Sequence, residues 1–230
     1  MPLLGPAAML LCFDIDAGAV EEHDRWHTHE HLPERLSIPG FRRGTRWVAV
    51  EGMPRYMVVY EVEDLATLSS PAYLGRLNDP TPWTSRMMVH YRGMRRGLCS
   101  VLGSFGRGLG GDAALIRFNP SAGRAEALHR WLVAEALPRM PVTAGLGSAH
   151  LLRGAQAAAM TNEQKIRGAD QGIDSAVVLI GYDGEAVARE ARALVAEGSI
   201  DARSDAVEIG VYRLGYALAR TDIASDSPLS

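Results

Sequence analysis

The chain repeats its own most distinctive stretch about halfway along. The segment WHTHEHLPERLSIPG, Trp26 to Gly40, is followed 105 residues later (131 minus 26) by WLVAEALPRMPVTAG, Trp131 to Gly145. The same offset relates further pairs: Phe13/Phe118, Glu30/Glu135, Leu32/Leu137 and Pro33/Pro138. Self-similarity at a fixed spacing indicates that one structural unit has been used twice. Each copy, of roughly 105 to 115 residues, has the size of a small domain.

We therefore expect two copies with the same order of elements: strand, helix, strand, strand, helix, strand. Apolar runs rich in strand formers, and stretches with a helical spacing of apolar residues, supply the ranges. The predicted strands are 8–15, 41–50, 56–62 and 97–104, then 113–118, 146–153, 175–182 and 207–218; the main helices are 19–32 and 64–77, then 121–137 and 185–197. Pro33 should end the first helix, because the residue before a proline disfavours the α conformation.

The domain plan adds a linker, an insertion and a tail. The first repeat spans 1–105, the glycine-rich stretch 106–112 (GRGLGGD) is a flexible linker, and the second repeat spans 113–220. Matching Met57 to Ala176 raises the offset to 119, so the second copy has 14 extra residues (119 minus 105) within 155–174. We expect a surface loop there, either a tolerated insertion or a lid. The tail, 221–230, is expected to be disordered.

Several predicted strands are apolar on both faces. In the first strand Leu11 and Phe13 alternate with Leu10 and Cys12, and MVVYEV and AVVLIGY are similar. An antiparallel sheet with one face in water would alternate apolar and polar residues. One apolar face of each sheet should pack against the helices of its own repeat. The simplest partner for the other face is the sheet of the other repeat. The predicted fold class is α+β: two βαββαβ repeats packed sheet to sheet as one barrel around an interior cavity, with the helices outside.

The first repeat resembles a known family. The segments WHTHEHLPERLSIPGFRRGTRW, EGMPRYMVVYEVEDLATLSSPAY and NDPTPW are similar to uncharacterised EthD-like proteins of the dimeric α+β barrel superfamily. The likeness covers most of residues 8–104, and its most specific part is W-x-x-x-E-H-x-P-E-R-x-x-x-P-G-F. The second copy resembles the family only in outline, since Ala136 stands where the first has His31. The resemblance implies ferredoxin-like units that usually pair as homodimers, here joined as an intramolecular pseudo-dimeric α+β barrel. The superfamily includes cofactor-free monooxygenases, isomerases, haem-dependent enzymes and proteins of no known activity.

Charge and composition limit the kinds of partner and the cellular location that we expect. The net charge is −3, the pI is about 6.2, and no Lys/Arg cluster carries aromatic residues between its members, so we expect no nucleic acid partner. No apolar run approaches the roughly 20 residues of a membrane span, and no basic segment precedes the N-terminal apolar run, so we expect neither a membrane partner nor a signal peptide. Cys12 and Cys99 lie in apolar runs typical of reduced, buried thiols, which predicts a cytoplasmic protein.

A stripe of histidines marks the first helix. His23, His27 and His31 are four residues apart and share one helical face. They correspond to three apolar residues in the second copy: Leu128, Leu132 and Ala136. The stripe should therefore pack on the sheet. Three interpretations stay open: the histidines line a pocket between helix and sheet, they are structural and partnered by neighbouring carboxylates, or they bind a metal. No third ligand with recognisable spacing appears, so no metal ligand is predicted.

Within this stripe, His31 and His27 are the candidate catalytic residues. His31 lies beside the helix end and matches the histidine of the family-like phrase, and an imidazole with a pKa near ~6.5 can give or take a proton at neutral pH. His23 and Arg35 are candidate substrate-binding residues. Arg35 corresponds to Met140 in the second copy. It either holds a substrate carboxylate or lies in solvent.

Three more candidate substrate-binding residues are expected to point into the barrel. These are Trp47, Tyr60 and Arg117. Arg117 stands where the first copy has Cys12, and a buried charge there requires a partner or an anionic ligand.

The candidates favour an enzyme acting on a small organic molecule, aromatic or carbonyl-bearing, through histidine acid–base groups. Isomerisation, dehydration and cofactor-free oxygenation are open to such a site. The sequence has no phosphate loop in a strand-to-helix setting and no G-x-S-x-G, CxxC or HExxH motif, so no cofactor is predicted. Two alternatives remain: a non-catalytic small-molecule binding or accessory protein, and a haem-binding barrel with an axial histidine. Pairing of two pseudo-dimeric chains into a homodimer is also left open.

Overall fold

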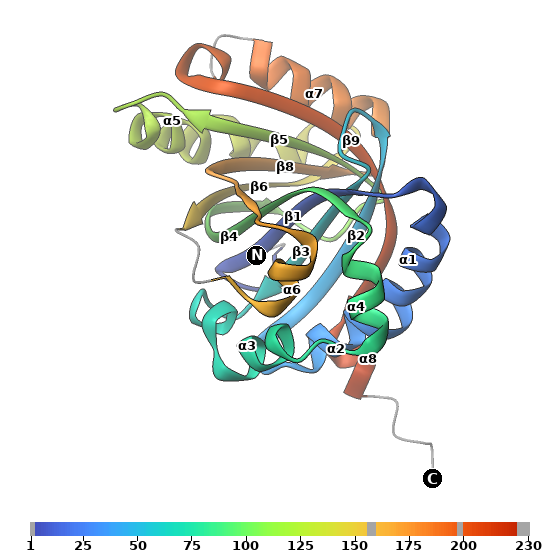
Figure 1. Cartoon of the computed structure of the whole chain (residues 1–230). Coiled ribbons are helices and arrows are strands. Elements are labelled where there is room, and N and C mark those ends of the chain that lie inside the picture. The colour runs from blue at the N-terminus through green and yellow to red at the C-terminus, as the bar shows by residue number, and fades with distance from the viewer. Residues whose placement is uncertain (1–2, 156–159, 197–199, 225–230) are drawn as a thin grey trace.

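Eight antiparallel strands close into a barrel in the part of the chain that the computed structural model describes, residues 3–155, 160–196 and 200–224 (Figure 1). The strands follow the order β1–β3–β2–β9–β5–β8–β6–β4, and β4 pairs with β1 to close the ring. Their bounds are β1 Ala7–Ile15, β2 Phe41–Glu51, β3 Tyr56–Val62, β4 Tyr91–Gly106, β5 Asp112–Pro120, β6 Leu146–Ala155, β8 Ser175–Gly181 and β9 Ser204–Ala219. The predicted α+β barrel is confirmed.

The two halves of the chain build this ring in the same way. The strand order is β4–β1–β3–β2 in the first half and β9–β5–β8–β6 in the second. The halves meet at two seams, where β2 pairs with β9 and β4 pairs with β6. Strands β4 and β9 have 16 residues each, so each pairs at one end within its own half and at the other end with the opposite half.

Helices cover the outside of the barrel (Figure 1). Their bounds are α1 Val20–Trp26, α2 Leu32–Ser37, α3 Pro71–Asn78 and α4 Pro82–Met88 in the first half, then α5 Ala125–Trp131, α6 Asn162–Arg167, α7 Gly184–Ala196 and α8 Arg220–Ala224. Because side chains alternate across a strand, each strand contributes to two cores. In β1, Met9 and Phe13 pack under the first-half helices, whereas Leu10 and Cys12 face the barrel interior.

The barrel interior is filled with side chains, so the prediction of an interior cavity is wrong. Apolar residues from both halves meet there, among them Trp47, Leu115 and Tyr212. The hollow beside Trp47 has a volume of about 20 Å³, enough for one water molecule. An eight-stranded barrel is narrow enough for large side chains from its walls to fill.

The first helix continues past Pro33, where the sequence predicted its end. After α1, His27–His31 form a π-helical turn in which the Leu32 N–H donates to the His27 carbonyl, and α2 follows with Pro33 in its first turn. The wider turn accommodates the proline, whose ring would otherwise clash with the carbonyl of the preceding turn. The second half has a matching π-helical turn, Leu132–Ala136.

The insertion of the second half is ordered structure, not the predicted loop. It contains α6 and the short strand β7, Gln171–Gly172, which pairs with β4. Helix α6 packs against α3 and α4 of the first half (Figure 1). Gly154 on β6 permits the close approach of the end of the insertion, because a Cβ at that position would lie 1.9 Å from the Ile173 carbonyl oxygen. Residues 156–159 of the insertion lie outside the described residues.

The linker and the tail are also partly built into the fold. Leu109, in the predicted linker, packs against the interior of the barrel. The tail begins with helix α8, and Asp222 accepts a hydrogen bond of 2.7 Å from the Ala219 N–H. The prediction of disorder is wrong for residues 221–224, while 225–230 lie outside the described residues.

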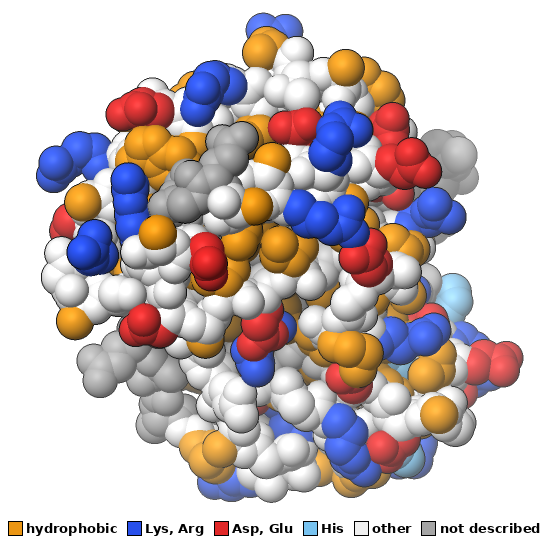
Figure 2. All heavy atoms as spheres, turned by 90° about the horizontal axis from the view of Figure 1, so that it is seen from above, with side chains coloured by type: hydrophobic (Ala, Val, Ile, Leu, Met, Phe, Trp, Pro, Cys, Tyr) orange, Lys and Arg blue, Asp and Glu red, His pale blue; other side chains and the backbone are white. Residues whose placement is uncertain are grey.

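The surface and the thiols agree with a protein that packs its apolar residues inside. On the face seen in Figure 2, basic and acidic side chains are interspersed and form no single basic patch. Among the described residues, no helix is both long and apolar enough to cross a membrane. Cys12 and Cys99 are free and buried, and burial raises the pKa of each thiol to about 12.

Candidate active site

The histidine stripe faces the barrel wall, as the comparison of the two copies predicted. His23, His27 and His31 are only 0%, 1% and 6% exposed. The corresponding residues of the second half, Leu128, Leu132 and Ala136, are buried against its own sheet. The imidazoles lie in a row, with ring centroids 5.5 Å apart from His23 to His27 and 5.6 Å apart from His27 to His31. The first half therefore keeps three ionisable rings where the second has an aliphatic core.

His23 has partners for both ring nitrogens. Its Nδ1 lies 3.3 Å from the Asp24 carboxylate, and its Nε2 lies 3.3 Å from the Tyr91 hydroxyl. Burial lowers the pKa of His23, and the hydrogen bond to Asp24 opposes this effect. Asp24 is itself held by the Tyr56 hydroxyl at 2.8 Å. The structural interpretation thus describes His23 well.

His27 and His31 are different, because each has a buried Nδ1 with no hydrogen-bond partner in the described structure. The Nε2 of His27 lies 3.5 Å from the Tyr60 hydroxyl, at the limit of a hydrogen bond. Burial lowers the pKa of both rings well below the usual value, and the positive charge of Arg35 lowers that of His31 further. Both imidazoles are therefore neutral at pH 7, and His31 has a free ring nitrogen.

Trp26 fixes one side of His31. The two rings lie 4.4 Å apart between centroids, and the Trp26 indole N–H donates to Glu30 at 3.1 Å. Thr81 also donates to Glu30, at 2.6 Å. This network holds the His31 ring in place through its neighbour.

Arg35 lies one turn beyond His31 and is buried, with 1% of its surface exposed. Its guanidinium donates to Glu163 of α6 and, at 3.2 Å, to Glu34. Burial disfavours its charged form, but the nearby carboxylates, Glu163 above all, raise the pKa of Arg35 above its usual range. Burial raises the pKa of Glu34. The cation thus remains charged in a dry environment and is balanced by carboxylates from both halves.

A small cavity lies among His31, Arg35, the barrel wall and α6. Its volume is about 20 Å³, room for a water molecule. Its walls come from both halves: Met9, Leu11, His31, Arg35, Tyr60, Tyr73, Leu77, Arg96, Thr161, Glu163 and Arg167. A surface cleft of about 250 Å³ lies next to it and shares Arg96. The Arg96 side chain donates to the Tyr73 hydroxyl at 3.1 Å and lies 4.0 Å from Asp170, so these residues form the partition between cleft and cavity.

The predicted site residues divide into two groups. His23, His27, His31 and Arg35 share the layer between helix and barrel, and Tyr60 joins them instead of pointing into the barrel as predicted. Every residue of β3 is buried, so the sequence could not distinguish its faces.

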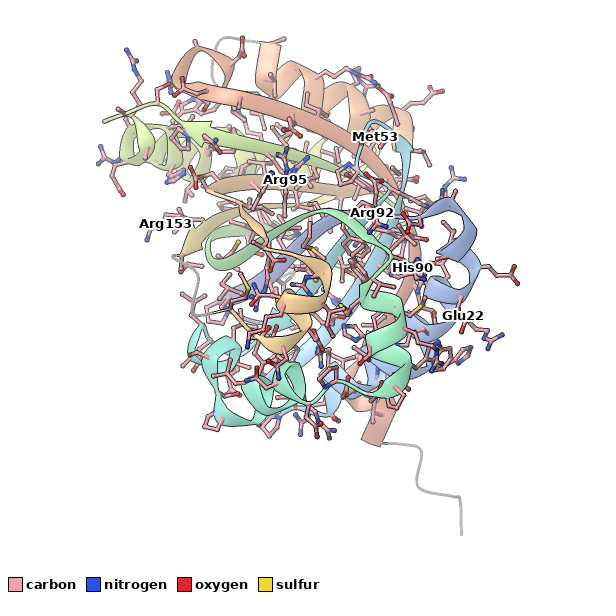
Figure 3. All side chains as sticks on the ribbon, in the orientation of Figure 1. Glu22, Met53, His90, Arg92, Arg95 and Arg153 are labelled. Carbon is pink, nitrogen blue, oxygen red and sulfur yellow. The ribbon has the colours of Figure 1, made fainter. Side chains whose placement is uncertain are left out.

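Trp47 and Arg117 belong to other parts of the barrel. Trp47 is buried in the interior, where its indole N–H donates to Thr45 at 2.9 Å. Arg117 donates to Glu208 at 2.5 Å, which supplies the partner that its buried charge requires. Arg95, labelled in Figure 3 among the strands, donates to the same Glu208 at 2.7 Å. Neither Trp47 nor Arg117 lines the cavity at His31.

Sequence reasoning missed five polar residues of this cavity: Tyr73, Arg96, Thr161, Glu163 and Arg167. The available signal was the length of the insertion, because three of the five come from it. Polar contacts also secure the segment before α1, through His90 and Arg92, which are labelled in Figure 3. Both contact Asp16, at 3.2 Å and 2.7 Å.

No family model and no curated protein matches the chain. Solved structures do match: an anthrone oxidase-like protein has a TM-score of 0.67 at 11% identity, covering 96% of this chain and 96% of that chain. A "putative monooxygenase" from Lactobacillus acidophilus has a TM-score of 0.60 at 9% identity, with 94% and 97% covered. A haem-binding protein from Thermus thermophilus has a TM-score of 0.51 at 9% identity, with 92% of each chain covered. The fold is that of the dimeric α+β barrels. At these identities the likeness shows the fold alone.

Haem does not fit the layer between helix and barrel in this arrangement. The cavity beside His31 measures about 20 Å³, whereas pockets for organic ligands measure roughly 300–1,000 Å³. Ring contacts with Trp26 and His27 hold the His31 imidazole on the helix side of this layer. Among the described residues, no group of three or more His, Cys, Asp or Glu side chains is arranged to hold a metal ion.

Proposed function

We propose that this protein is an acid–base enzyme that removes a proton from a small organic molecule, with His31 as the base. The observation that carries the proposal is the unpartnered Nδ1 of a buried, neutral His31 beside a cavity that also contains a buried arginine. An unpaired buried polar atom costs about 1–3 kcal/mol. A fold that keeps it, where the other half has alanine, favours a functional reason.

The roles of the neighbouring residues follow from their charge and position. His31 Nδ1 would take the proton from a carbon next to a carbonyl group, and the electron pair of that C–H bond would move onto the carbonyl oxygen. Arg35 supplies positive charge for the resulting enolate, and its burial strengthens this interaction. His27 and Tyr60 extend the polar wall on the barrel side. In the closed arrangement the cavity is too small for such a substrate, so α6 has to move before binding.

Proton removal is the shared first step of the three reaction types that the sequence left open. In isomerisation the proton returns to another carbon, and in dehydration a hydroxide leaves. In cofactor-free oxygenation the carbanion passes an electron to molecular oxygen, which is the co-reactant. The oxidase-like and monooxygenase descriptions of two structural neighbours favour the third type.

Deuterium exchange tests the proposal without knowledge of the product. Anthrone and acetophenone would be incubated with the full-length protein in D₂O, and loss of the acidic C–H signal would be followed by ¹H NMR. We expect the protein to accelerate exchange of at least one ketone, and His31→Asn to lose roughly 10²- to 10⁴-fold of that acceleration. His29→Asn is the matched control, because His29 lies in the same turn but is exposed.

Two outcomes would contradict this proposal. Equal exchange by the wild type and by folded His31→Asn would rule out His31 as the base. Ketone binding that depends on His31 but brings no exchange would favour the alternative, a non-catalytic binding protein.

The wider proposal covers ancestry, location and assembly. We propose an EthD-like ancestor duplicated in tandem, which the shared strand order and the matched helix stripes support. A cytoplasmic location would be tested by cell fractionation. Pairing of two chains into a homodimer would give twice the chain mass of 24.9 kDa by light scattering.

A further inference from the structure

Helix α6 covers the Arg35 side of the cavity mainly through polar contacts. Its buried residues are Glu163 and Gln164, whereas Ile166 is 39% exposed. Asn162 forms two hydrogen bonds with Asn78 of α3, at 2.8 Å and 3.1 Å. Since little apolar surface of α6 is buried, ion pairs and hydrogen bonds hold it in place. A competing ion can replace such contacts more easily than a hydrophobic interface.

Arg35 requires an anion in front of it. An arginine side chain stays protonated in proteins, and a buried charge without a counter-ion is strongly destabilising. Glu163 supplies this counter-ion from 128 residues further along the chain. It belongs to the insertion that only the second half contains.

Displacement of α6 would change the charge balance of the pocket. Beside the pocket the departing segment carries Glu163, Asp170 and Arg167, whereas its Lys165 is exposed to solvent, so two carboxylates leave the pocket with one guanidinium. Arg35 and Arg96 remain on the first half. Among the described residues, Glu34 is then the carboxylate within ion-pair distance of Arg35. The opened pocket is therefore positive.

Besides the positive charge, the lining of the pocket favours a ligand with an apolar carbon skeleton. Apolar and aromatic side chains line the wall opposite Arg35, with Met9, Leu11 and Leu77 beside Tyr60 and Tyr73. The adjoining cleft of about 250 Å³ leads to Arg96 from outside. His31, whose Nδ1 has no partner in the described structure, is also among the residues that line the cavity.

We propose that the pocket binds a small organic carboxylate, which replaces the Glu163 side chain on Arg35 and extends its carbon skeleton towards His31 and Tyr60. Helix α6 is then an internal competitor whose glutamate occupies the carboxylate position until the ligand arrives. This inference rests on the proposed function, since it names the class of molecule bound at the same site.

Matched pairs of probes test the inference in the full-length protein. Phenylacetate and benzoylacetate carry the carboxylate, and phenylacetamide and acetophenone are their neutral counterparts. Binding would be measured by isothermal titration calorimetry. We expect the carboxylates to bind more tightly than the neutral compounds. Glu163→Gln should tighten carboxylate binding about tenfold if α6 is displaced in about a tenth of the wild-type molecules. Arg35→Met should weaken it at least about tenfold, through loss of a charge-assisted contact. Glu185→Gln, an exposed glutamate on α7, is the charge-matched control.

Hydrogen exchange of the wild-type protein gives a second test if a variant fails to fold. Saturating phenylacetate should reduce amide protection in residues 162–167, and phenylacetamide should not. Carboxylate binding that is unchanged in Glu163→Gln and Arg35→Met, or that leaves α6 protection intact, would overturn the inference. Neutral ketones that bind in a His31-dependent way while carboxylates do not would overturn it and leave the proposed function standing. If the binding of neither kind of probe depends on Arg35 or on His31, both are wrong.

Discussion

Replacing His27 by leucine together with Tyr60 by phenylalanine should make the protein more stable. His27 is 1% exposed, and its Nδ1 has no partner in the described structure. Removing such an atom should recover about 1–3 kcal/mol. The 3.5 Å contact with the Tyr60 hydroxyl is at the limit of hydrogen bonding and contributes about 0.5 kcal/mol. The double substitution removes both the His27 imidazole and the Tyr60 hydroxyl, so it leaves no new buried polar atom without a partner.

The expected net gain in unfolding free energy is about 1–2 kcal/mol. For a chain of this length it corresponds to a rise in Tm of roughly 3–6 °C. Urea unfolding at pH 7 would measure it as a higher midpoint at unchanged m-value. The matched control is the reverse change in the second half, Leu132→His, which should cost about 2–4 kcal/mol because it buries an imidazole in an aliphatic core. A double variant less stable than the wild type by more than about 1 kcal/mol would refute the view that the stripe is kept at the expense of stability.

Two further predictions concern acid sensitivity and helix packing. Folding lowers the pKa values of His23, His27 and His31. Below the unfolded pKa of about 6.5, the unfolded chain therefore binds protons that the folded chain does not. The protein should lose stability as the pH falls. Between pH 6 and pH 5 the unfolding free energy from urea titrations should therefore fall less steeply in the double variant than in the wild type, by at most about 1.4 kcal/mol per pH unit. Parallel profiles would show that His27 is not buried as a neutral ring. Gly44→Ala should lower the unfolding free energy by about 1–3 kcal/mol, measured by thermal or urea unfolding, because the new Cβ would lie 2.2 Å from a methyl group of Leu32. The control is Gly75→Ala in α3, where a Cβ meets no atom within 4 Å, so this change should be neutral or slightly stabilising. Equal stabilities of the two variants would contradict this packing.

Local patterns in the sequence were enough to predict the barrel and the stripe. The repeat gave the same element order in both halves, and alternation of Leu10 and Cys12 with Leu11 and Phe13 indicated two buried faces for β1. Comparison of His27 with Leu132 predicted that the stripe packs on the sheet, because equivalent positions of the two copies should have equivalent surroundings.

Contacts between distant segments could not be predicted in this way. The Arg35–Glu163 pair joins a helix of the first half to an insertion in the second, and no periodicity links two such positions. The faces of β3 were ambiguous because its residues, apart from Glu61, are apolar or aromatic on both sides, so Tyr60 was placed in the wrong core. The interior was expected to be hollow because residue volumes around a ring cannot be summed before the strand register is known.

The two seams of the barrel, β2 with β9 and β4 with β6, lie within one polypeptide. Assembly of the ring is therefore a unimolecular event, unlike that of a barrel whose two subunits fold only on association. In a homodimer every substitution appears twice, at symmetry-related places. Covalent linkage removes that constraint, so the first helix can carry imidazoles at a cost in stability while the corresponding helix of the second half keeps an aliphatic face.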